Sequence, residues 1–481
     1  MSDSDLKSGA LGLVSVVMQG VTHIAPAIAI LLTVQFITAE AGLAAPLSYL
    51  IAVLIVLILG VVLTQLAKHF PSAGGYYTYV SRSVHPRAGF LVSWLYFFYS
   101  PIFVGVILAA VGSIVHDELL AQYGFNLPWW AFLLAGVALI GVLSYRGVEI
   151  SVKTMVAMGL IEIGLVVLLG FWGLFDPGSG GVNFDSFNPA NASSANGLYL
   201  GVVFSIFAIT GWEAAAAMGE ESEDPRRNVP RGIVGSLLIV GVFLIFTAWA
   251  FQIGWGTNDI AGFIESEELP PLVLAHQYWG GLWILLLLAA VNSAVAGGIA
   301  YTNVATRMWY AMARSGSLPR QLAHIHPRYK TPTVAIAVEI VLTTAVALFM
   351  GFLIGPFEEF VFFGIALTFA LVFIYGSANL GVFLYYRRER RSEFNPILHL
   401  LFPLLGTAAL LWVAYKTVNP FPESPNNWAP IVIGIWLALG VLILLVMRSR
   451  GKEEWLLRAG QVAAEELPAR EEAIEHRPPL V

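Results

Sequence analysis

Twelve apolar runs of the sequence are long enough, or nearly long enough, to cross a lipid bilayer as helices. A hydrocarbon core about 30 Å thick requires about 20 apolar residues per helix, and lipid offers no hydrogen bonds to exposed backbone. With 58% hydrophobic and 12% charged residues, the chain is expected to be an all-α integral membrane protein with 12 transmembrane helices. The expected spans cover residues 10–38, 44–67, 87–115, 128–145, 151–174, 198–219, 231–254, 279–312, 332–354, 357–386, 396–416 and 428–447.

The basic residues are distributed unevenly over the segments between these spans. Of the 25 Lys and Arg residues, all but Lys416 lie at the termini or in loops on the same side as the termini. The two longest loops on the other side, 175–197 and 255–278, contain neither Lys nor Arg. Because cytoplasmic loops are rich in these residues, both termini are expected to be cytoplasmic. No cleavable signal peptide precedes the first span, so we expect a multi-pass protein of the plasma (inner) membrane.

Two of the spans contain breaks that a plain membrane helix avoids. Pro26 lies midway along the first span, where it removes a backbone donor and disfavours helix at Ala25. Thr210 and Gly211 weaken the sixth span. Interrupted helices in matching positions of two halves are typical of inverted-repeat transporters. The expected division is a cytoplasmic N-terminus at 1–9, a first five-helix repeat at 10–174, a second, inverted repeat at 198–386, helices 11 and 12 at 396–447, and a cytoplasmic tail at 448–481.

Several polar side chains are expected at membrane depth. An unpaired carboxylate there costs at least about 3 kcal/mol, so an intramembrane acid usually has a function such as proton or ion transfer. For Glu162 and His23 the alternative is a buried group that hydrogen-bonds to a neighbouring helix. The candidates for ion or proton coupling are Glu213, Glu162, His23, Asn292 and Ser293.

The sequence contains no pattern that indicates an enzyme. Without cysteine there is no thiolate metal site or thiol nucleophile, and no metal-ligand spacing, Ser-His arrangement or nucleotide-binding loop is present. We therefore expect no enzymatic activity, no metal and no cofactor, and the modest net charge of −6 gives no reason to expect a nucleic acid partner. The alternative from a different functional class is a nutrient sensor. Such a protein would bind the nutrient without transporting it and would signal through the C-terminal tail.

Three loops carry longer motifs, on the side of the membrane where the termini are expected. They are FPSAGGYY at 70–77, GEESEDPRRNVPR at 219–231 and RMWYAMARSGSLP at 307–319. In these motifs, and in the Gly-Trp-Glu triplet at 211–213, the chain resembles the amino acid–polyamine–organocation (APC) transporter superfamily over essentially its whole membrane region. Within the second motif we expect ion pairs of Arg226, Arg227 and Arg231 with Glu220, Glu221 and Asp224.

The resemblance implies a five-plus-five inverted-repeat fold with discontinuous helices 1 and 6 and two C-terminal helices. It places the solute between the interrupted parts of spans one and six, with Phe207 as an aromatic gate and Trp212 as a second lid. It also links Glu213 to proton coupling. The implied solute contacts are Thr22, Ile24, Ala25, Pro26, Ala27, Phe207, Ile209, Thr210, Gly211 and Trp212.

Two positions depart from the pattern of many amino acid permeases. Residues 24–26 read Ile-Ala-Pro where those permeases have Gly-Ser-Gly. Because Pro26 has no N–H, a substrate carboxylate must use Ala27 or Ile28, or the substrate lacks an α-carboxylate. Glu162 occupies a position where several proton-coupled members have a lysine. An acid there could carry the proton, help to bind Na⁺, or hold a cationic group of the protein or the substrate.

The sequence thus predicts a secondary active transporter that moves an amino acid across the plasma membrane by alternating access, with proton symport as the expected coupling. A transporter of polyamines or other amines, an amino acid exchanger, and coupling to Na⁺ are the alternatives. The expected partners are a small amino acid or amine, the proton and the lipid bilayer.

Overall fold

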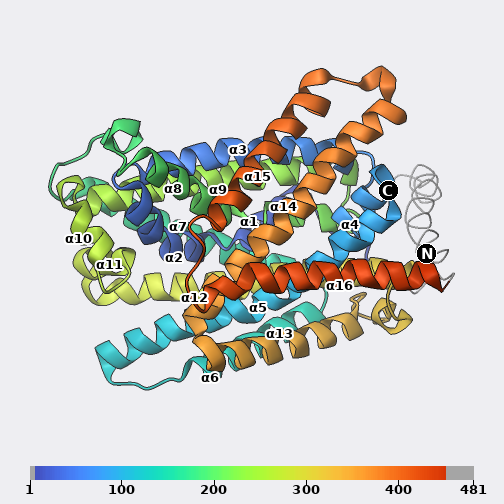
Figure 1. Ribbon diagram of the computed structural model, residues 1–481. Coiled ribbons are helices and arrows are strands. Elements are labelled where there is room, and N and C mark those ends of the chain that lie inside the picture. The colour runs from blue at the N-terminus through green and yellow to red at the C-terminus, as the bar shows by residue number, and fades with distance from the viewer. Residues whose placement is uncertain (1–5, 451–481) are drawn as a thin grey trace, which may run out of the picture.

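The structure is a computed structural model that describes residues 6–450, and helices dominate this range without a named strand (Figure 1). Eleven helical segments of the described chain are long and apolar enough to cross a membrane, and a twelfth, α6 (Trp129–Tyr145), is apolar but shorter. The predicted all-helical membrane fold is therefore confirmed, whereas the tail expected at 448–481 lies almost wholly outside the described residues. The other spans are α1 with α2 (Leu13–Ile24, Pro26–Ala41), α3 (Ala45–Ala67), α5 (Pro86–Tyr123), α7 (Val148–Phe175), α8 with η3 (Ala195–Ile209, Trp212–Met218), α9 (Pro225–Trp255), α12 (Ile284–Arg314), α13 (Thr333–Ile354), α14 (Pro356–Arg388), α15 (Phe402–Thr417) and α16 (Ala429–Ser449).

Both predicted helix breaks are present. Ala25 separates α1 from α2 with φ 55° and ψ 69°, a left-handed conformation that a non-glycine residue rarely adopts. Pro26 is the first residue of α2, where a missing N–H costs nothing because that group has no partner within the helix. In the sixth span, α8 ends at Ile209, Thr210 is extended, and Gly211 has φ 116°. The chain then continues as η3, a 3₁₀ helix.

The two broken helices lie inside the bundle, and the last two helices lie outside it. In the first span, 89% of the most apolar 18-residue window is buried, compared with 11% in the last span, which contains α16. Within the bundle, α1 packs on α9 and η3, and α2 packs on α8. The breaks are therefore enclosed by protein, as broken backbone at membrane depth requires.

The two ends of the bundle differ in what they carry (Figure 1). The described part of the chain both begins and ends at one end of the bundle, beside the short helix α4 (Tyr76–Ser83), and we call this the terminal end. The short helices α10 (Ile260–Glu265) and α11 (Pro270–Trp279) lie at the opposite end, which we call the loop end. A described chain that begins and ends on the same side agrees with an even number of spans.

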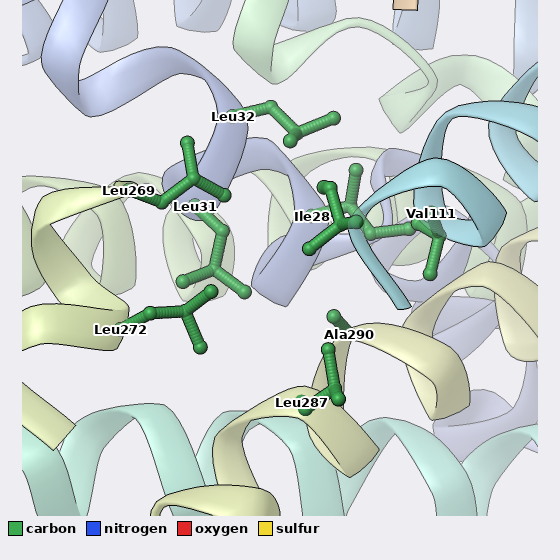
Figure 2. Close-up of a pocket in the computed structure, with 9 residues that line it drawn as sticks. Ile28, Leu31, Leu32, Val111, Leu269, Leu272, Leu287 and Ala290 are labelled. Carbon is green, nitrogen blue, oxygen red and sulfur yellow. The ribbon is translucent and has the colours of Figure 1, made fainter. Parts of the chain in front are cut away.

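At the loop end, only apolar side chains line a cavity of about 10 Å³ beside α2 (Figure 2). Ile28, Leu31 and Leu32 of α2 face Leu272 of α11 and Leu287 of α12 across it. A space of this size is near the lower limit for one water molecule and offers it no polar partner. This cavity is a packing gap and not a binding site.

A reciprocal pair of tryptophans fixes α16 to α5. The indole N–H of Trp94 donates to the backbone carbonyl of Trp436 at 2.7 Å, and that of Trp436 donates to the carbonyl of Trp94 at 2.8 Å. The two rings stack with centroids 4.4 Å apart. In a helix that is otherwise largely exposed, this pair joins α16 to α5 by two hydrogen bonds and a ring stack.

We expect Trp94→Phe and Trp436→Phe each to destabilise the protein by about 1 kcal/mol, because each removes one hydrogen bond and keeps an aromatic ring. Thermal unfolding in detergent measures the loss. Trp172→Phe is the matched control, since Trp172 is 42% exposed on α7. An equal loss of stability in all three variants would show that the Trp94–Trp436 pair does not fix α16 to α5.

Candidate functional site

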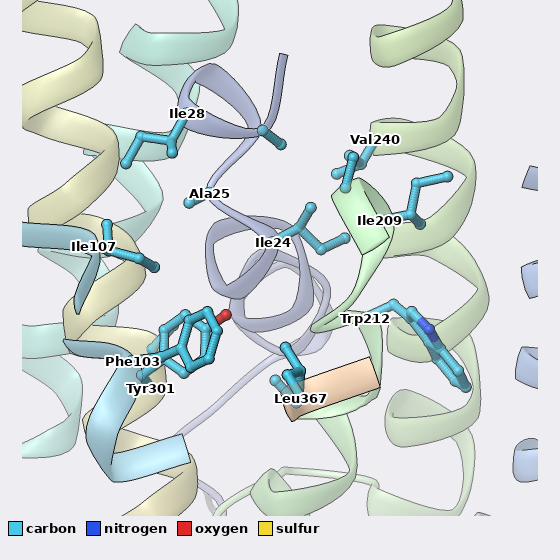
Figure 3. Close-up of a cluster of buried hydrophobic side chains, with 14 of the residues drawn as sticks. Ile24, Ala25, Ile28, Phe103, Ile107, Ile209, Trp212, Val240, Tyr301 and Leu367 are labelled. Atoms are coloured by element: carbon cyan, nitrogen blue, oxygen red, sulfur yellow. The ribbon is translucent and has the colours of Figure 1, made fainter. Parts of the chain in front are cut away.

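The two helix breaks are in direct contact with each other (Figure 3). A Cβ atom added to Gly211 would lie 2.6 Å from Cδ2 of His23 and 3.0 Å from its backbone carbonyl carbon. The positive φ of Gly211 also disfavours any other residue. Only glycine therefore allows the break of the sixth span to approach the end of α1 this closely.

A cavity of about 40 Å³ lies between the two breaks. Its walls are mainly apolar and aromatic, and Figure 3 shows the overlapping rings of Phe103 and Tyr301, whose centroids are 5.9 Å apart. Of the solute contacts implied by the resemblance, four line it: Ile24, Ala25, Phe207 and Thr210. Ile28, which the sequence interpretation considered as a backbone donor, also lines it. The sequence interpretation did not include the others: Ala29, Thr33, Phe103, Ile107, Ala208, Tyr301, Phe360 and Leu367.

The remaining implied contacts lie behind this lining. Trp212 is 1% exposed and packs on Tyr375 with ring centroids 5.3 Å apart, so in this conformation it does not cover the cavity. Asn292, a predicted coupling residue rather than a solute contact, donates to the backbone carbonyl of Met158 at 2.6 Å and thereby joins α12 to α7. Five further residues shape the breaks without facing the cavity: Thr22, Pro26, Ala27, Ile209 and Gly211.

His23, in the last turn of α1, is buried against α5 and α12. Its Nε2 atom lies 3.3 Å from the hydroxyl of Tyr99, and its ring lies 3.8 Å from that of Tyr301. The Tyr99 hydroxyl in turn donates to that of Tyr301 at 3.4 Å. The histidine thus connects the end of α1 to a wall of the cavity.

Glu213 is buried at the start of η3. Its Oε1 accepts a hydrogen bond from the hydroxyl of Tyr96 at 3.1 Å, and its Oε2 accepts one from the backbone N–H of Gly211 at 3.2 Å. The hydroxyl of Tyr375 lies near the same carboxylate. The carboxylate therefore holds the second break directly, since one of its two partners is the residue that contacts His23.

Glu162 of α7 is also completely buried and lies at the first break. Its carboxylate faces the backbone N–H of Ala27 and the hydroxyl of Ser293, although neither contact has the geometry of a full hydrogen bond. The Ser293 hydroxyl also accepts from the N–H of Ile28 at 3.5 Å. Of the predicted coupling residues, Glu162 and Ser293 therefore come together, whereas Asn292 forms a separate contact.

A larger space of about 350 Å³ lies on the loop-end side of the cavity. The two spaces share Thr33, Phe207 and Phe360 as lining residues. The rings of Phe207 and Phe360 meet edge to face with centroids 5.9 Å apart, and Phe207 also packs against Gly364. Two phenyl rings therefore separate the cavity from this vestibule.

The terminal end is closed by two ion pairs. Arg307 donates to Glu221 at 3.0 Å with both side chains 1% exposed, and Arg314 binds both carboxylate oxygens of Glu220 at 2.7 and 3.0 Å. The N–H groups of Ala10 and Leu11 also donate to the backbone carbonyl of Glu221. We call the Glu221–Arg307 and Glu220–Arg314 pairs the terminal latch.

The terminal latch corrects part of the expectation for the loop after span six. Arg227 does pair with Asp224, at 3.7 Å, but both side chains are largely exposed. The prediction was wrong for Glu221, whose arginine partner is Arg307 of α12. A pairing across 86 positions is set by the packing of α12 against this loop, which local charge spacing does not reveal.

Comparison with known proteins agrees with this architecture. The sequence profile of the amino acid permease family matches residues 15–457. The chain belongs to the amino acid permease family. It is 26% identical over 450 residues to the low-affinity putrescine importer PlaP of Escherichia coli (strain K12). The alignment covers 90% of this chain and 92% of the importer.

Other permease relatives differ in their solutes. The serine/threonine exchanger SteT of Bacillus subtilis (strain 168) is 26% identical over 388 residues, covering 78% of this chain and 83% of SteT. The branched-chain amino acid permease BcaP of Lactococcus lactis subsp. cremoris (strain MG1363) is 23% identical over 461 residues, covering 86% of this chain and 89% of BcaP.

In this permease we expect Gly211→Ala to abolish function and to lower stability by about 1–3 kcal/mol, because the added methyl group forces the two breaks apart and strains the backbone. Uptake and thermal unfolding measure the two effects. Gly164→Ala is the control, since a Cβ atom there meets nothing within 4 Å. Normal uptake by the Gly211 variant would show that the close contact is dispensable.

Breaking the terminal latch is expected to open the terminal end. Glu221→Gln leaves Arg307 buried without its counter-charge, a change that costs about 3–5 kcal/mol in a closed, buried site. Because the chain has no cysteine, a cysteine placed at buried Ala217 of η3 reports opening without background labelling by maleimide. We expect faster labelling in Glu221→Gln and no change in Glu393→Gln, which breaks an exposed pair with Arg390. Equal rates in both would contradict the latch.

Proposed function

We propose that this chain is a secondary active transporter that carries a small amino-group-bearing solute, an amino acid or an amine, by alternating access. The observation that carries the proposal is the cavity between two broken helices. On one side it is separated by the Phe207–Phe360 pair from the larger vestibule, and on the other side the terminal latch closes the path. A site with one closure on each side is what alternating access requires. These features support transport over enzymatic activity and over binding by a non-transporting sensor.

We further propose that the terminal end faces the cytoplasm of a plasma (inner) membrane. The excess of Lys and Arg in the loops at that end supports this orientation. The vestibule and Phe207 then face the outside, and the terminal latch faces the cytoplasm. In this conformation the solute path is blocked on both sides, with the thinner barrier outside.

The division into inverted halves at 10–174 and 198–386 remains part of the proposal. It is supported by the equivalent positions of the two breaks, each of which interrupts the first span of its half. The break at Ala25 is followed by α2, and the break at Gly211 is followed by η3. Helices α15 and α16 are then an addition to the transport core.

We propose proton coupling through Glu213, and its hydrogen bonds support this role. The ionised carboxylate accepts from both Tyr96 and the N–H of Gly211. Protonation removes the charge, weakens both bonds and releases the break that is locked against His23. A proton that moves across about 100 mV supplies about 2.3 kcal/mol, enough for about 50-fold accumulation of a solute. Glu162, the second buried acid beside the breaks, is the alternative proton site.

The relatives are named for different solutes, so the proposed substrate class of this chain includes both amino acids and amines. One is named as a putrescine importer, one as a serine/threonine exchanger and one as a branched-chain amino acid permease. The exchanger also provides the specific alternative to proton symport, namely exchange of one solute for another.

The test is uptake of labelled amino acids and polyamines into proteoliposomes without sodium, with and without a pH gradient that is acidic outside. We expect accumulation only with the gradient. Glu213→Gln, which mimics the protonated acid, is expected to lose gradient-driven accumulation and to keep exchange against preloaded solute. Glu339→Gln is the matched control, because this buried acid of α13 bonds to Thr302 away from the breaks.

Several outcomes would contradict parts of the proposal. Full pH-dependent accumulation in both Glu213→Gln and Glu162→Gln would refute proton coupling through these acids. Uptake that depends on added Na⁺ or on preloaded solute, and not on the gradient, would assign sodium coupling or exchange instead. No uptake of any solute under all three conditions would refute transport itself.

A further inference from the structure

Four helix ends meet around the central cavity, and they carry different partial charges. The helices α1 and α8 end there, and α2 and η3 begin there. A helix start exposes N–H groups and attracts anions, whereas a helix end exposes carbonyl oxygens and attracts cations. Groups that already have partners within the protein are less available to a solute. The charge of the solute therefore depends on which helix ends have such partners.

The start of α2 faces polar groups of the protein itself. Pro26 has no N–H, and the N–H of Ala29 donates to the carbonyl of Ala25 at 2.8 Å. This leaves Ala27, whose N–H faces the carboxylate of Glu162, and Ile28, whose N–H lies 3.5 Å from the hydroxyl of Ser293. A carboxylate from a solute would have to compete with a buried carboxylate of the protein for the same helix end.

The start of η3 is occupied in the same way. The N–H of Gly211 donates to Glu213 at 3.2 Å, and the N–H of Ala214 donates to the carbonyl of Gly211 at 3.0 Å. Glu213 is 3% exposed, so water offers little competition for this bond. Both helix starts beside the cavity are therefore associated with an acid of the chain.

The two helix ends carry carbonyl oxygens that have no donor within their own helix. In α1, the carbonyl of Thr22 accepts from the N–H of Ala25, and in α8 the carbonyl of Phe207 accepts from Thr210. The other carbonyls of each last turn have no donor within their helix. They include those of Ile24 and Ala208, residues that line the cavity.

The cavity wall supplies aromatic faces and no positive charge. None of its lining residues is Lys, Arg or His. Four of them carry aromatic rings: Phe103, Phe207, Tyr301 and Phe360. Aromatic faces attract cations with a strength of about 0.5–2 kcal/mol per contact, most strongly where water is excluded. The nearest histidine, His23, is itself buried against Tyr99 and Tyr301.

We propose that the solute is an organic amine without an α-carboxylate, recognised through its ammonium group. The proposal rests on the transport function proposed above and specifies the substrate class of the same site. The ammonium lies against the carbonyl ends of α1 and α8, and its hydrocarbon part lies among the aromatic side chains. Glu162 and Glu213 supply negative charge, which attracts the ammonium group of a cationic solute. The same charge would repel the α-carboxylate of an amino acid.

The test compares matched pairs that differ only in the carboxylate: leucine with isoamylamine, ornithine with 1,4-diaminobutane, and phenylalanine with phenethylamine. Phenylalanine methyl ester is added because it keeps the substituent size and loses the negative charge. Uptake into proteoliposomes is measured for each labelled compound, and protein-free liposomes correct for passive entry. In at least one pair we expect the amine to have a KM at least about tenfold below that of the amino acid, with the ester following the amine.

The outcomes separate this inference from the proposed function. If every transported pair favours the amino acid, the substrate class is refuted and transport stands. If no compound of either class is transported, the proposed transport function fails as well.

Glu162→Gln tests the part played by the internal acid. We expect it to lower the preference for amine over amino acid by about tenfold, because the helix start loses its competing charge. Glu339→Gln, the buried-acid control, is expected to keep the wild-type preference. Should Glu162→Gln not transport, ligand-induced shifts in Tm of the purified protein give the same preference. An unchanged preference in Glu162→Gln would overturn the role assigned to Glu162.

Discussion

Backbone that leaves a helix within a bilayer must find its hydrogen bonds in protein, and the central architecture here depends on that constraint. At Ala25 and at Gly211 the helical ladder stops, and polar side chains of the protein approach the exposed groups. Glu162 and Ser293 approach the first break, and Glu213 bonds to the second. Two buried acids of the membrane core, Glu162 and Glu213, therefore lie where the backbone needs polar partners.

This constraint explains why much of the fold could be predicted from the sequence. Apolar runs of membrane length identify the spans, and Pro26 and Gly211 mark the breaks because their backbone preferences are local properties. Intramembrane acids are rare, so Glu162 and Glu213 also stood out without a structure. Each of these features can be recognised within a few residues of sequence.

The rest of the site could not be predicted, because it depends on how helices rotate against one another. Phe103, Tyr301 and Phe360 are three aromatic residues among many in apolar helices, and nothing local distinguishes a cavity wall from ordinary packing. The pairing of Glu221 with Arg307 likewise joins segments far apart in sequence. The resemblance to known permeases identified the broken helices but not these partners, since it was carried by motifs in the loops and at the breaks.

The two closures differ in chemistry, and this difference suits the proposed alternating access. Separating Phe207 from Phe360 exposes apolar surface to water, which costs about 25 cal/mol for each Å². Separating Glu221 from Arg307 in a dry site would cost far more, but opening the terminal end admits water that hydrates both charges and offsets their lost attraction. The terminal latch is therefore stable only while it is dry. A closure of this kind favours fully closed and fully open states over partly open ones, as alternating access requires.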